Sequence, residues 1–337
     1  MKYAIGIDLG ATNLRYGLVD TDKGDIVWKP KKKKRTPFND QSKLLSLLEE
    51  SIKETRSAAK KKFKAGKIGA GMGSPGPLDQ FERKLFNPFN IQCGDVDLSE
   101  HVDVLKNDLD MIGMGHFAYG AAHTEGEKKN LKDYDAVAVI APGTGLGFTM
   151  IIDGKPYIGS RRNGGVSCEL GWIPFFGSKK DDFKKDKFLE PYTAGEAPFS
   201  IWENHYSDES TKETKETLKE ILSSGEKSRA DISYELEQFA KQGDVGCMRT
   251  YEDIAKNLAI GTATFATLFN PDIVVFDGSI SKAFNNLPTL KEYFKDTYDE
   301  HVVKPFKDLP VVFEPPVEDA GIKGAAYMAA NSKELIK

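Results

Sequence analysis

The order of strand-like and helix-like segments predicts an α/β protein with two similar lobes that face each other across a cleft. Three observations lead to this expectation. A pattern of hairpin, helix and strand occurs in the first part of the chain and again in the second part. Each copy carries a glycine-rich turn directly after its first strand. The chain has 337 residues, 39% of them hydrophobic, and this length is more typical of two lobes than of one.

The first copy begins at about residue 2 with "KYAIGIDLG", a strand pattern that ends in glycine. Two further strand patterns, "TNLRYGLVD" and "IVWKPK", flank a tight turn at "TDKGD", as in antiparallel hairpins. Residues 41–62 carry leucine and isoleucine at helical spacing, which predicts an amphipathic helix. The segments "KIGAGMG" and "MIGMG" predict two more strands, and the second of them ends just before His116.

The second copy opens with the strand pattern "YDAVAVIAPG" and continues through "GLGFTMIIDG" and "KPYIGS". A helix pattern covers about residues 251–268, and the strand "DIVVFDG" follows it. A helix near Leu290, the strand "PVVFEPP" and the helix "AGIKGAAYMAAN" complete the series. Ligands of such folds bind where strand ends and glycine turns meet, so the two glycine turns mark the expected site.

Composition and charge exclude several classes of function. The net charge is −4 and the isoelectric point is near 5.9, so the chain has no overall attraction to nucleic acid. The three cysteines lie far apart without a CxxC pair, which argues against a disulfide framework or a cysteine zinc site. The sequence has no apolar run of 18 residues and no signal peptide pattern. We therefore expect a cytoplasmic protein that binds neither nucleic acid nor membranes.

Two lysine runs, at residues 29–35 and 60–64, allow a nuclear-localisation or polyanion-binding interpretation. The first run follows a predicted hairpin strand. The second ends a predicted helix, where cations interact favourably with the helix dipole. We therefore assign neither run a function.

The candidate chemistry begins at the turn "GIDLGATN". A glycine turn between strands lets backbone N–H groups approach phosphate oxygens, and the carboxylate of Asp8 can hold a magnesium ion directly or through water. Taken alone, this turn could equally be a plain hairpin with Gly10 at positive φ.

A second glycine turn, "APGTGLG", stands at the corresponding place in the second copy. A pair of such turns is a more specific signal for phosphate binding than either turn alone. In addition, "NPDIVVFDGSIS" places small residues at the end of a buried strand, where an adenine ring and a ribose could lie flat. The predicted site for ATP and its phosphates comprises Asp8, Gly10, Thr12, Asn13, Gly143, Thr144, Gly145, Asp277, Gly278 and Ser279.

Eight segments in a fixed order resemble the ROK family of sugar kinases and sugar-responsive repressors, within the actin, Hsp70 and hexokinase superfamily. They are "IDLGATNLRYGLVD", "GSPGPLD", "NPFNI", "APGTGLG", "NGGVSCELGW", "LEPYTAGEA", "NPDIVVFDGSIS" and "DAGIKGAAYMAA", and they extend over nearly the whole chain. The resemblance implies two ribonuclease-H-like lobes around an interlobe cleft, with residues 1–116 in the N-terminal lobe and 117–318 in the C-terminal lobe. A helix within 319–337 would pack back on the first lobe. The resemblance also implies a homodimer or homotetramer.

The same resemblance implies phosphorylation of a hexose or amino-sugar hydroxyl by ATP and Mg²⁺. Carboxylates and amides can read the stereochemistry of vicinal hydroxyls. The family's repressors carry a DNA-binding domain before the first strand, and we expect none here. The sequence identifies neither the sugar nor whether ATP or polyphosphate is the phosphate donor. The implied sugar-binding residues are Gly73, Pro75, Asn90, Glu169, Trp172 and Glu190.

Two departures from the family pattern alter the expected site. Family kinases end the strand before the interlobe helix with Asn-Asp, and this aspartate deprotonates the sugar hydroxyl. Counting back from "AYGAAHTEG", which we expect to be a helix, these positions fall on His116 and Phe117, so the aspartate is predicted to be missing. The family's zinc-binding histidine and cysteine-rich loop are replaced by Trp172 and the lysine-rich "GSKKDDFKKDKF", so no structural zinc is expected.

Three alternatives remain open for the missing base. His116 could take the proton, because an imidazole exchanges protons near neutral pH. Asp108 or Asp110 could act instead if the register is shifted, although both precede the strand predicted at 111–115. Otherwise the chain is a non-catalytic sugar or nucleotide sensor that descends from such a kinase. The two hypotheses are therefore a divergent sugar kinase and a sensor.

Overall fold

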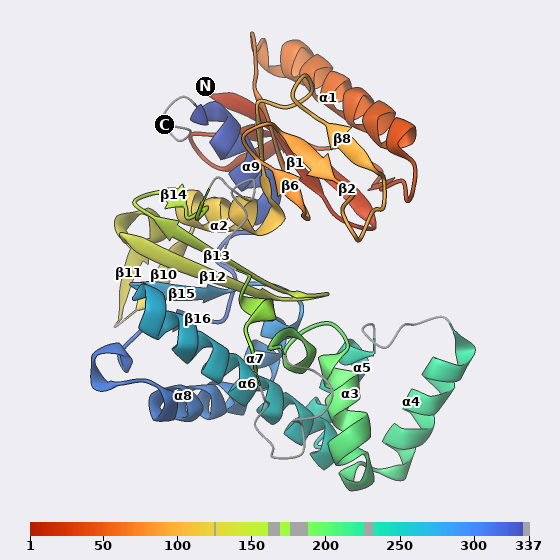
Figure 1. The fold of residues 1–337 in the computed structure, drawn as a ribbon, viewed down its shortest axis with the longest axis vertical. Helices are drawn as coiled ribbons and strands as arrows, with labels where there is room; N and C mark the ends of the chain where they lie inside the picture. Colours follow the sequence, from red (N-terminus) through yellow and green to blue (C-terminus); the bar gives the residue numbers. More distant parts are fainter. Residues whose placement is uncertain (125, 161–168, 176–187, 226–231, 333–337) are drawn as a thin grey trace. The chain divides into compact units, whose positions relative to one another are not determined.

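The structure, a computed structural model, describes residues 1–124, 126–160, 169–175, 188–225 and 232–332 (Figure 1). It is a mixed α/β fold that divides into two compact units, each of which is described by itself. The predicted lobe boundaries at residues 116 and 318 and the interlobe cleft stay predictions. The first unit comprises Met1–Ala138, Thr149–Cys168 and Pro316–Lys337, and the second comprises Val139–Phe148 and Glu169–Pro315.

The first unit is built on a six-stranded sheet in which β3, β2, β1, β5 and β9 lie in that order and β4 pairs with β2. β1 is antiparallel to β2, whereas β5 is parallel to β1 and β9 is parallel to β5. The predicted hairpin around the first glycine turn and the strand at "KIGAGMG" are confirmed. The strands are β1 (Tyr3–Leu9), β2 (Asn13–Asp20), β3 (Asp25–Trp28), β4 (Lys34–Arg35), β5 (Ala70–Ser74) and β9 (Val104–Asn107).

Helix α1 (Gln41–Phe63) confirms the helix predicted at 41–62. Asp40 precedes it, and its side chain accepts from the N–H of Lys43 at 2.9 Å, which satisfies a free donor of the first turn. Leu44, Leu48 and Ile52 recur on one face and are buried in the core of the first unit. The second lysine run ends this helix, as expected.

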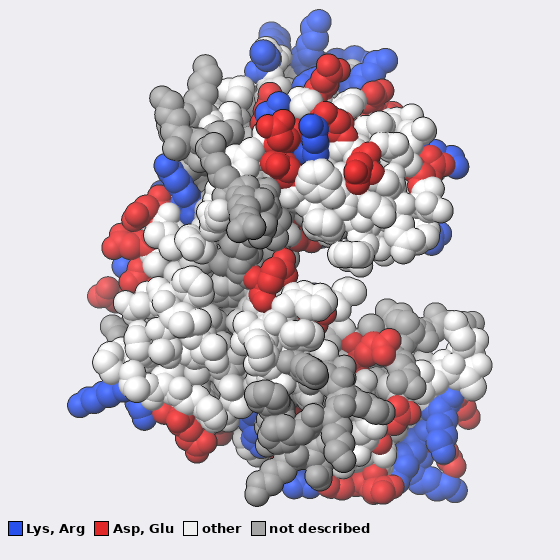
Figure 2. Space-filling model, in the orientation of Figure 1, with Lys and Arg blue, Asp and Glu red and all other residues white. Residues whose placement is uncertain are grey.

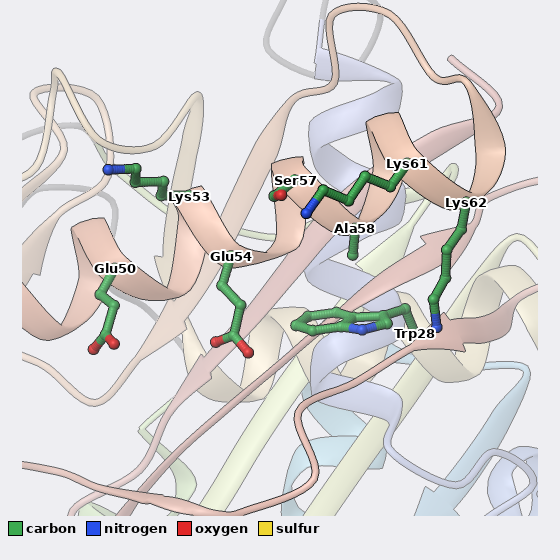
Figure 3. A pocket seen from close by; sticks show the side chains of 8 residues that line it. All are labelled: Trp28, Glu50, Lys53, Glu54, Ser57, Ala58, Lys61 and Lys62. Carbon is green, nitrogen blue, oxygen red and sulfur yellow. The ribbon is translucent and has the colours of Figure 1, made fainter.

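A surface groove of about 490 Å³ lies between α1 and β3 (Figure 3). Glu54, one of the lining residues, accepts from the hydroxyl of Tyr16 at 2.7 Å and pairs with Lys34 at 3.5 Å. None of the predicted site residues lines the groove. The lining residues are Trp28, Glu50, Lys53, Glu54, Ser57, Ala58, Lys61 and Lys62.

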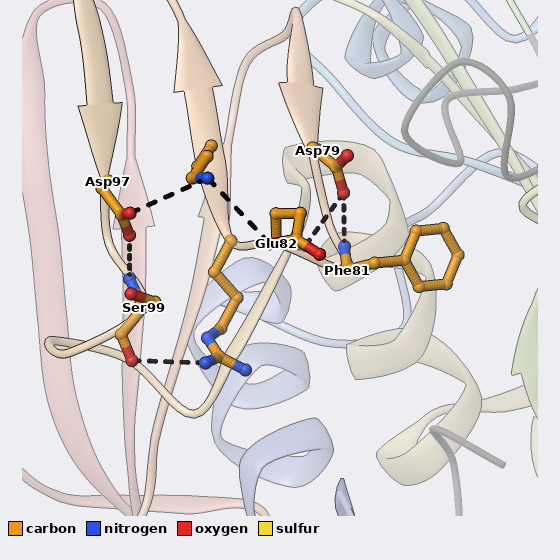
Figure 4. Close-up of polar contacts among 7 residues, drawn as sticks. Asp79, Phe81, Glu82, Asp97 and Ser99 are labelled. Carbon is orange, nitrogen blue, oxygen red and sulfur yellow. Dashed lines mark hydrogen bonds and ion pairs between the residues drawn. The ribbon is translucent and has the colours of Figure 1, made fainter.

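A small three-stranded sheet follows β5 and was not predicted, because its strands are only two or three residues long. Its turns are held by side chains that bond to nearby backbone (Figure 4). Asp79 accepts from the N–H groups of Phe81 and Glu82 at 2.8 and 2.9 Å, and Asp97 accepts from the N–H of Ser99 at 2.9 Å. The strands are β6 (Leu78–Asp79), β7 (Lys84–Phe86) and β8 (Asp95–Asp97).

Helix α9 (Ala320–Ala330) confirms the last predicted helix and packs on β1 in the first unit (Figure 1). Glycines make this close approach possible. A Cβ at Gly6 of β1 would lie 1.8 Å from the carbonyl oxygen of Ile322, and a Cβ at Gly71 of β5 would lie 2.0 Å from that of Ala325. Since no side chain fits at such distances, backbone lies directly on backbone here.

The strand predicted at "MIGMG" is wrong, because these residues belong to helix α2 (Asp108–Tyr119). The helix predicted at "AYGAAHTEG" is also wrong. Gly120 ends α2, and the next residues form β10 (Ala121–Thr124), which pairs with β11 (Glu127–Asn130). Methionine, glycine and phenylalanine are buried on all sides of α2, so no single apolar stripe reveals its helical period.

The second sheet has the order β14, β13, β12, β15 and β16, and the boundary between the units falls within β12 and β13. All five strands were predicted, although β14 and β16 are shorter than expected. They are β12 (Ala136–Pro142), β13 (Leu146–Ile152), β14 (Lys155–Pro156), β15 (Ile273–Phe276) and β16 (Val311–Val312).

In the second unit, the long helix α6 packs on α8. The side chain of Asp244 accepts from the N–H of Cys247 at 2.9 Å and so begins α6. Within the described ranges, no helix is both long and apolar enough to cross a membrane. The α-helices are α3 (Ala197–Ile201), α4 (Lys212–Ser224), α5 (Ser233–Lys241), α6 (Val245–Phe269), α7 (Ala283–Asn286) and α8 (Thr289–His301).

Short 3₁₀ and π turns connect these elements. They are η1 (Leu131–Asp133), η3 (Leu170–Trp172), η5 (Glu190–Tyr192), η6 (Trp202–Tyr206), η7 (Ser207–Glu209), η8 (Ile280–Lys282) and η9 (Lys304–Phe306). On the face shown in Figure 2, basic and acidic side chains are interspersed over the first unit, as the small net charge leads one to expect.

Candidate functional site

The first unit brings several predicted residues together at the carboxyl ends of its parallel strands. Asp8 of β1 lies in register with Gly73 of β5, and Gly73 lies in register with Lys106 of β9. A Cβ at Gly73 would lie 3.3 Å from the Cα of Asp108. The first glycine turn, the "GSPGP" segment and the start of α2 therefore meet at one edge of the sheet.

Asn107 and Asp108 occupy the junction between β9 and α2. The side-chain oxygen of Asn107 accepts from the N–H of Leu109 at 2.9 Å and caps the helix, and Asp108 is its first residue. An Asn-Asp pair thus stands where a strand gives way to a helix. Counting back from the helix expected at "AYGAAHTEG" assigned this place to His116 and Phe117 instead.

The prediction that His116 and Phe117 end a strand is wrong. Both lie in the last turn of α2, and His116 is completely buried. Phe117 is also buried, and its ring lies 3.4 Å from the place that a Cβ at Gly154 would take. The structural argument for His116 as the base therefore no longer holds, and Phe117 is a core residue.

The strand edge of the first unit is rich in carboxylates whose charges interact. Burial, together with the charges of Asp8 and Asp110, raises the pKa of Asp108 to about 7. Burial also raises the pKa of Asp8, although its ion pair with Arg15 opposes this shift. Asp110 accepts a hydrogen bond from the hydroxyl of Thr149 at 2.7 Å. A protonatable carboxyl group thus lies among charged neighbours, which is common at catalytic sites.

The first glycine turn is closed by backbone and hydroxyl hydrogen bonds. The N–H of Gly10 donates to the carbonyl of Asn13 at 3.1 Å. Thr36 donates through its hydroxyl to the carbonyl of Gly10 at 2.7 Å and through its N–H to the carbonyl of Thr12 at 2.9 Å. Gly10 is not among the described glycines with positive φ, so the turn does not depend on glycine for that reason.

The end of the first lysine run lies beside this turn, which sequence distance did not indicate. Arg35 of β4 pairs with Asn13 of β2 and is exposed. Its neighbour Lys34 turns instead to the carboxylates of Glu50 and Glu54, at 3.2 and 3.5 Å. A guanidinium group is therefore placed at the edge of the predicted phosphate turn.

The second unit brings its two predicted nucleotide segments together. In the turn between β12 and β13, the N–H of Gly143 donates to the carbonyl of Gly145 at 2.9 Å. The N–H of Asp277 donates to the carbonyl of Ile140 at 2.8 Å. Gly278 has φ +98°, and a Cβ there would lie 2.6 Å from the carbonyl oxygen of Pro142. Only glycine allows this approach, which brings the turn after β15 against the end of β12. Ser279 follows directly and precedes η8.

Glu190 makes a contact that sequence reasoning missed. One of its carboxylate oxygens accepts from the N–H of Leu146, the first residue of β13, at 2.8 Å. A Cβ at Gly145 would lie 2.7 Å from the same oxygen. A residue implied to bind sugar is thus bonded to the backbone of the phosphate turn, and no sequence motif indicates this contact because the two segments are 44 residues apart.

Three implied sugar residues of the second unit are neighbours. The N–H of Trp172 donates to the carbonyl of Glu169 at 3.1 Å, and burial together with the charge of Glu190 raises the pKa of Glu169. The indole of Trp172 is 61% exposed, with its centre 5.3 Å from the ring centre of Phe188. An exposed aromatic face suits the C–H face of a sugar, and the carboxylates of Glu169 and Glu190 can accept from sugar hydroxyls.

Other predicted features are not brought together. Asn90 is exposed on the loop after β7, and Pro75 follows β5, so their sugar-binding roles stay predictions. Among the described residues, no group of three or more His, Cys, Asp or Glu side chains is arranged to hold a metal ion. Most of the lysine-rich segment that replaces the zinc loop lies outside the described residues.

Comparisons with known proteins identify the family and the fold of the chain. The ROK family model matches residues 4–332. A glucokinase of Thermotoga maritima is 27% identical over 334 residues, covering 96% of this chain and 95% of that protein. A ROK hexokinase structure from Thermus thermophilus superposes with a TM-score of 0.71 at 22% identity, covering 98% of this chain and 99% of that one. A ROK family glucokinase structure from Streptomyces griseus, in complex with glucose and AMPPNP, superposes with a TM-score of 0.69 at 24% identity, with the same coverage. The expected α/β fold is therefore confirmed as the fold of ROK kinases.

Proposed function

Because the chain belongs to the ROK family, we propose that it is a sugar kinase that transfers the terminal phosphate of ATP to a hydroxyl of a hexose or amino sugar. The observation that carries this proposal is the Asn107–Asp108 pair at the end of β9, beside Asp8 and Gly73. Family kinases have their catalytic Asn-Asp at such a junction. Sequence counting found no aspartate at the expected position of the base, and Asp108 is the residue that we propose for this role.

Asp108 is the proposed general base. Its carboxylate takes the proton of the sugar hydroxyl as the oxygen attacks the phosphate, and Asn107 fixes the first turn of the helix that carries it. A carboxyl group with a pKa of about 7 is a stronger base than an ordinary aspartate and is still ionised in a large fraction of molecules at neutral pH. This balance favours proton transfer under cellular conditions.

Magnesium and ATP are the proposed partners of the two glycine turns. The carboxylate of Asp8 would hold Mg²⁺ directly or through water, and Asp319 adds negative charge beside it. The carboxylates of Asp8, Asp108 and Asp319 outnumber the cations Arg15 and Lys29 that pair with them, and this balance fits a divalent metal ion. When bound, MgATP supplies the phosphate and neutralises charge that develops on it. The turn at Gly143 and the adjacent Gly278 offer a backbone surface without bulky side chains for the nucleotide.

The sugar is proposed to contact Gly73 in the first unit and Glu169, Trp172 and Glu190 in the second. Trp172 replaces the histidine of the family pattern, so this part of the sugar site is more apolar. We infer an altered preference among sugars rather than a loss of binding. A cytoplasmic location and a homodimer or homotetramer stay predictions.

The sensor hypothesis was motivated by Phe117 at the expected position of the base and by Trp172. Because Phe117 lies within α2 and not at a strand end, its position gives that hypothesis less support. The proposal is tested by coupling ADP release to absorbance with MgATP and glucose, mannose, fructose, allose, N-acetylglucosamine and N-acetylmannosamine. We expect turnover of at least one sugar, and a fall in kcat of about 10²–10⁴-fold in Asp108→Asn. His116→Gln is the matched control and should keep its activity.

If the native protein turns over none of these sugars although calorimetry shows that it binds both sugar and nucleotide, the result would contradict the kinase proposal and favour the sensor hypothesis. Loss of activity in His116→Gln with unchanged melting temperature would restore His116 as the base.

A further inference from the structure

Glu190 is held against the glycine turn between β12 and β13 by contacts on both sides. Its carboxylate accepts from the N–H of Leu146 at 2.8 Å. A Cβ at Gly145 would lie 2.7 Å from the carboxylate, and a Cβ at Gly171 would lie 3.2 Å from the Cβ of Glu190. Two glycines therefore leave just enough space for this side chain, and its orientation is fixed by packing as well as by the hydrogen bond.

The segment that carries Glu190 also holds the other end of the same turn. The N–H of Gly195 donates to the carbonyl of Gly143 at 2.8 Å. Gly195 has φ +60°, and a Cβ there would lie 2.7 Å from the carbonyl oxygen of Thr144. Contacts from residues 190–195 thus reach both ends of the turn, at Gly143 and at Leu146.

Hydrogen bonds of this kind decide which N–H groups of the turn remain available to a ligand. The N–H of Gly143 is used within the turn and that of Leu146 is used by Glu190. A glycine turn without such anchors has many accessible conformations, and a ligand must then supply the free energy of ordering it. A turn that is already ordered binds phosphate more tightly.

We propose that Glu190 is a positioning residue for the donor phosphate: by bonding to Leu146 it holds the second glycine turn in the conformation that receives the nucleotide. This role is separate from the contact with sugar that the family resemblance implies, and it rests on the proposed function only for the identity of the ligand. It requires an acceptor oxygen at position 190, not a negative charge.

The test compares Glu190→Gln with Glu190→Ala, because both variants are neutral and only glutamine retains an acceptor oxygen. Binding of ADP with Mg²⁺ is measured by calorimetry without sugar. We expect Glu190→Ala to bind about fivefold more weakly than Glu190→Gln, the factor for one lost neutral hydrogen bond. The matched pair Glu169→Gln and Glu169→Ala should show no such difference, since Glu169 carries a neighbouring carboxylate with no bond to the turn among the described contacts.

A second measurement does not need a ligand. Amide hydrogen exchange of the turn in the free protein should become at least about fivefold faster at Leu146 in Glu190→Ala, and should stay near the native rate in Glu190→Gln. If Glu190→Ala fails to fold, Glu190→Met fills the space without an acceptor and takes its place. Equal exchange at Leu146 in the glutamine and alanine variants would overturn the proposal.

The two measurements separate this proposal from the proposed function. Native protein that does not bind ADP contradicts the kinase, and the exchange rates still decide whether Glu190 orders the turn. Native protein that binds ADP, with equal affinity in Glu190→Gln and Glu190→Ala, contradicts the positioning role alone.

Discussion

Asp108, the proposed general base, would combine a catalytic role with a cost to folding. It begins α2 in a half-buried position, and desolvation together with the charges of Asp8 and Asp110 raises the pKa of its carboxyl group. Both effects disfavour the ionised form that a general base must use. The family resemblance led sequence analysis to expect an aspartate at a strand end, but the junction itself depends on where β9 stops, which the sequence did not reveal.

The pH dependence of turnover follows from the pKa of Asp108. The base acts as a carboxylate, so kcat/KM should fall as the pH is lowered through about 7 and should level off above it. Asp110→Asn removes a charge that raises this pKa, so its acidic limb should move to lower pH. The measurement is kcat/KM at saturating MgATP from pH 5.5 to 9. An acidic limb centred near 4 would contradict Asp108 as the base.

The raised pKa of Asp108 also predicts that Asp108→Asn, which should inactivate the protein, increases the free energy of unfolding. The folded pKa of Asp108 is about 7 and its ordinary value is 3.8, so ionisation opposes folding increasingly as the pH rises from about 4 to 7. Asparagine removes that cost. Asp108→Asn without ligands should be more stable than the native protein by about 1–2 kcal/mol at pH 8, and the gain should vanish near pH 4. Urea unfolding at the two pH values measures it, and equal gains at both would contradict the argument.

At the scale of elements, most strands and long helices could be predicted, and the exceptions have physical causes. β1, β2, β12, β13 and β15 are buried strands beside glycine turns, and α1 has one apolar face. α2 was assigned as a strand because it is buried all round and gives no helical period. The bond from Glu190 to Leu146 could not be predicted, because it joins a loop to a strand through the tertiary fold alone.

The packing of α9 on α2 predicts an unequal response to the same substitution at two glycines. A Cβ at Gly324 would lie 1.8 Å from the carbonyl oxygen of Met111, whereas a Cβ at Gly66 would meet nothing within 4 Å. Gly324→Ala should therefore lower the free energy of unfolding by about 3 kcal/mol or more, because backbone must move. Gly66→Ala, the control, should change it by less than about 1 kcal/mol. Thermal and urea unfolding compare the two, and equal stability would show that α9 packs differently.

At the scale of the whole molecule, the family match from residue 4 to residue 332 is stronger evidence for the fold than any single motif. The glycine turns, the strand ends and α9 come from distant parts of the chain, and each alone is a weak signal. Their order along the sequence predicted the fold, whereas the proposal of Asp108 as the base depends on the three-dimensional structure. The proposed motif at 107–108 lies nine positions before 116–117, and the family assignment is the same for either position.

Ligand binding should stabilise the chain as a whole. A ligand that binds only the folded protein adds about 2.7 kcal/mol at a concentration 100 times its Kd. MgADP should therefore raise the melting temperature, and EDTA should remove most of this gain, because Asp8 would hold the Mg²⁺ that accompanies the nucleotide and the ion would neutralise phosphate charge. Magnesium without nucleotide is the control. An equal rise with ADP in EDTA would contradict a role for Mg²⁺ beside Asp8.

The close contact between β1 and α9, which glycines make possible, has a consequence for folding during synthesis on the ribosome. β1 leaves the exit tunnel long before α9, which covers Ala4 and Val19 in one apolar cluster. Until α9 emerges, that face of the nascent sheet has no cover from its own chain. The first unit therefore completes its folding only after α9 has emerged, which lengthens its exposure to chaperones and to aggregation during synthesis.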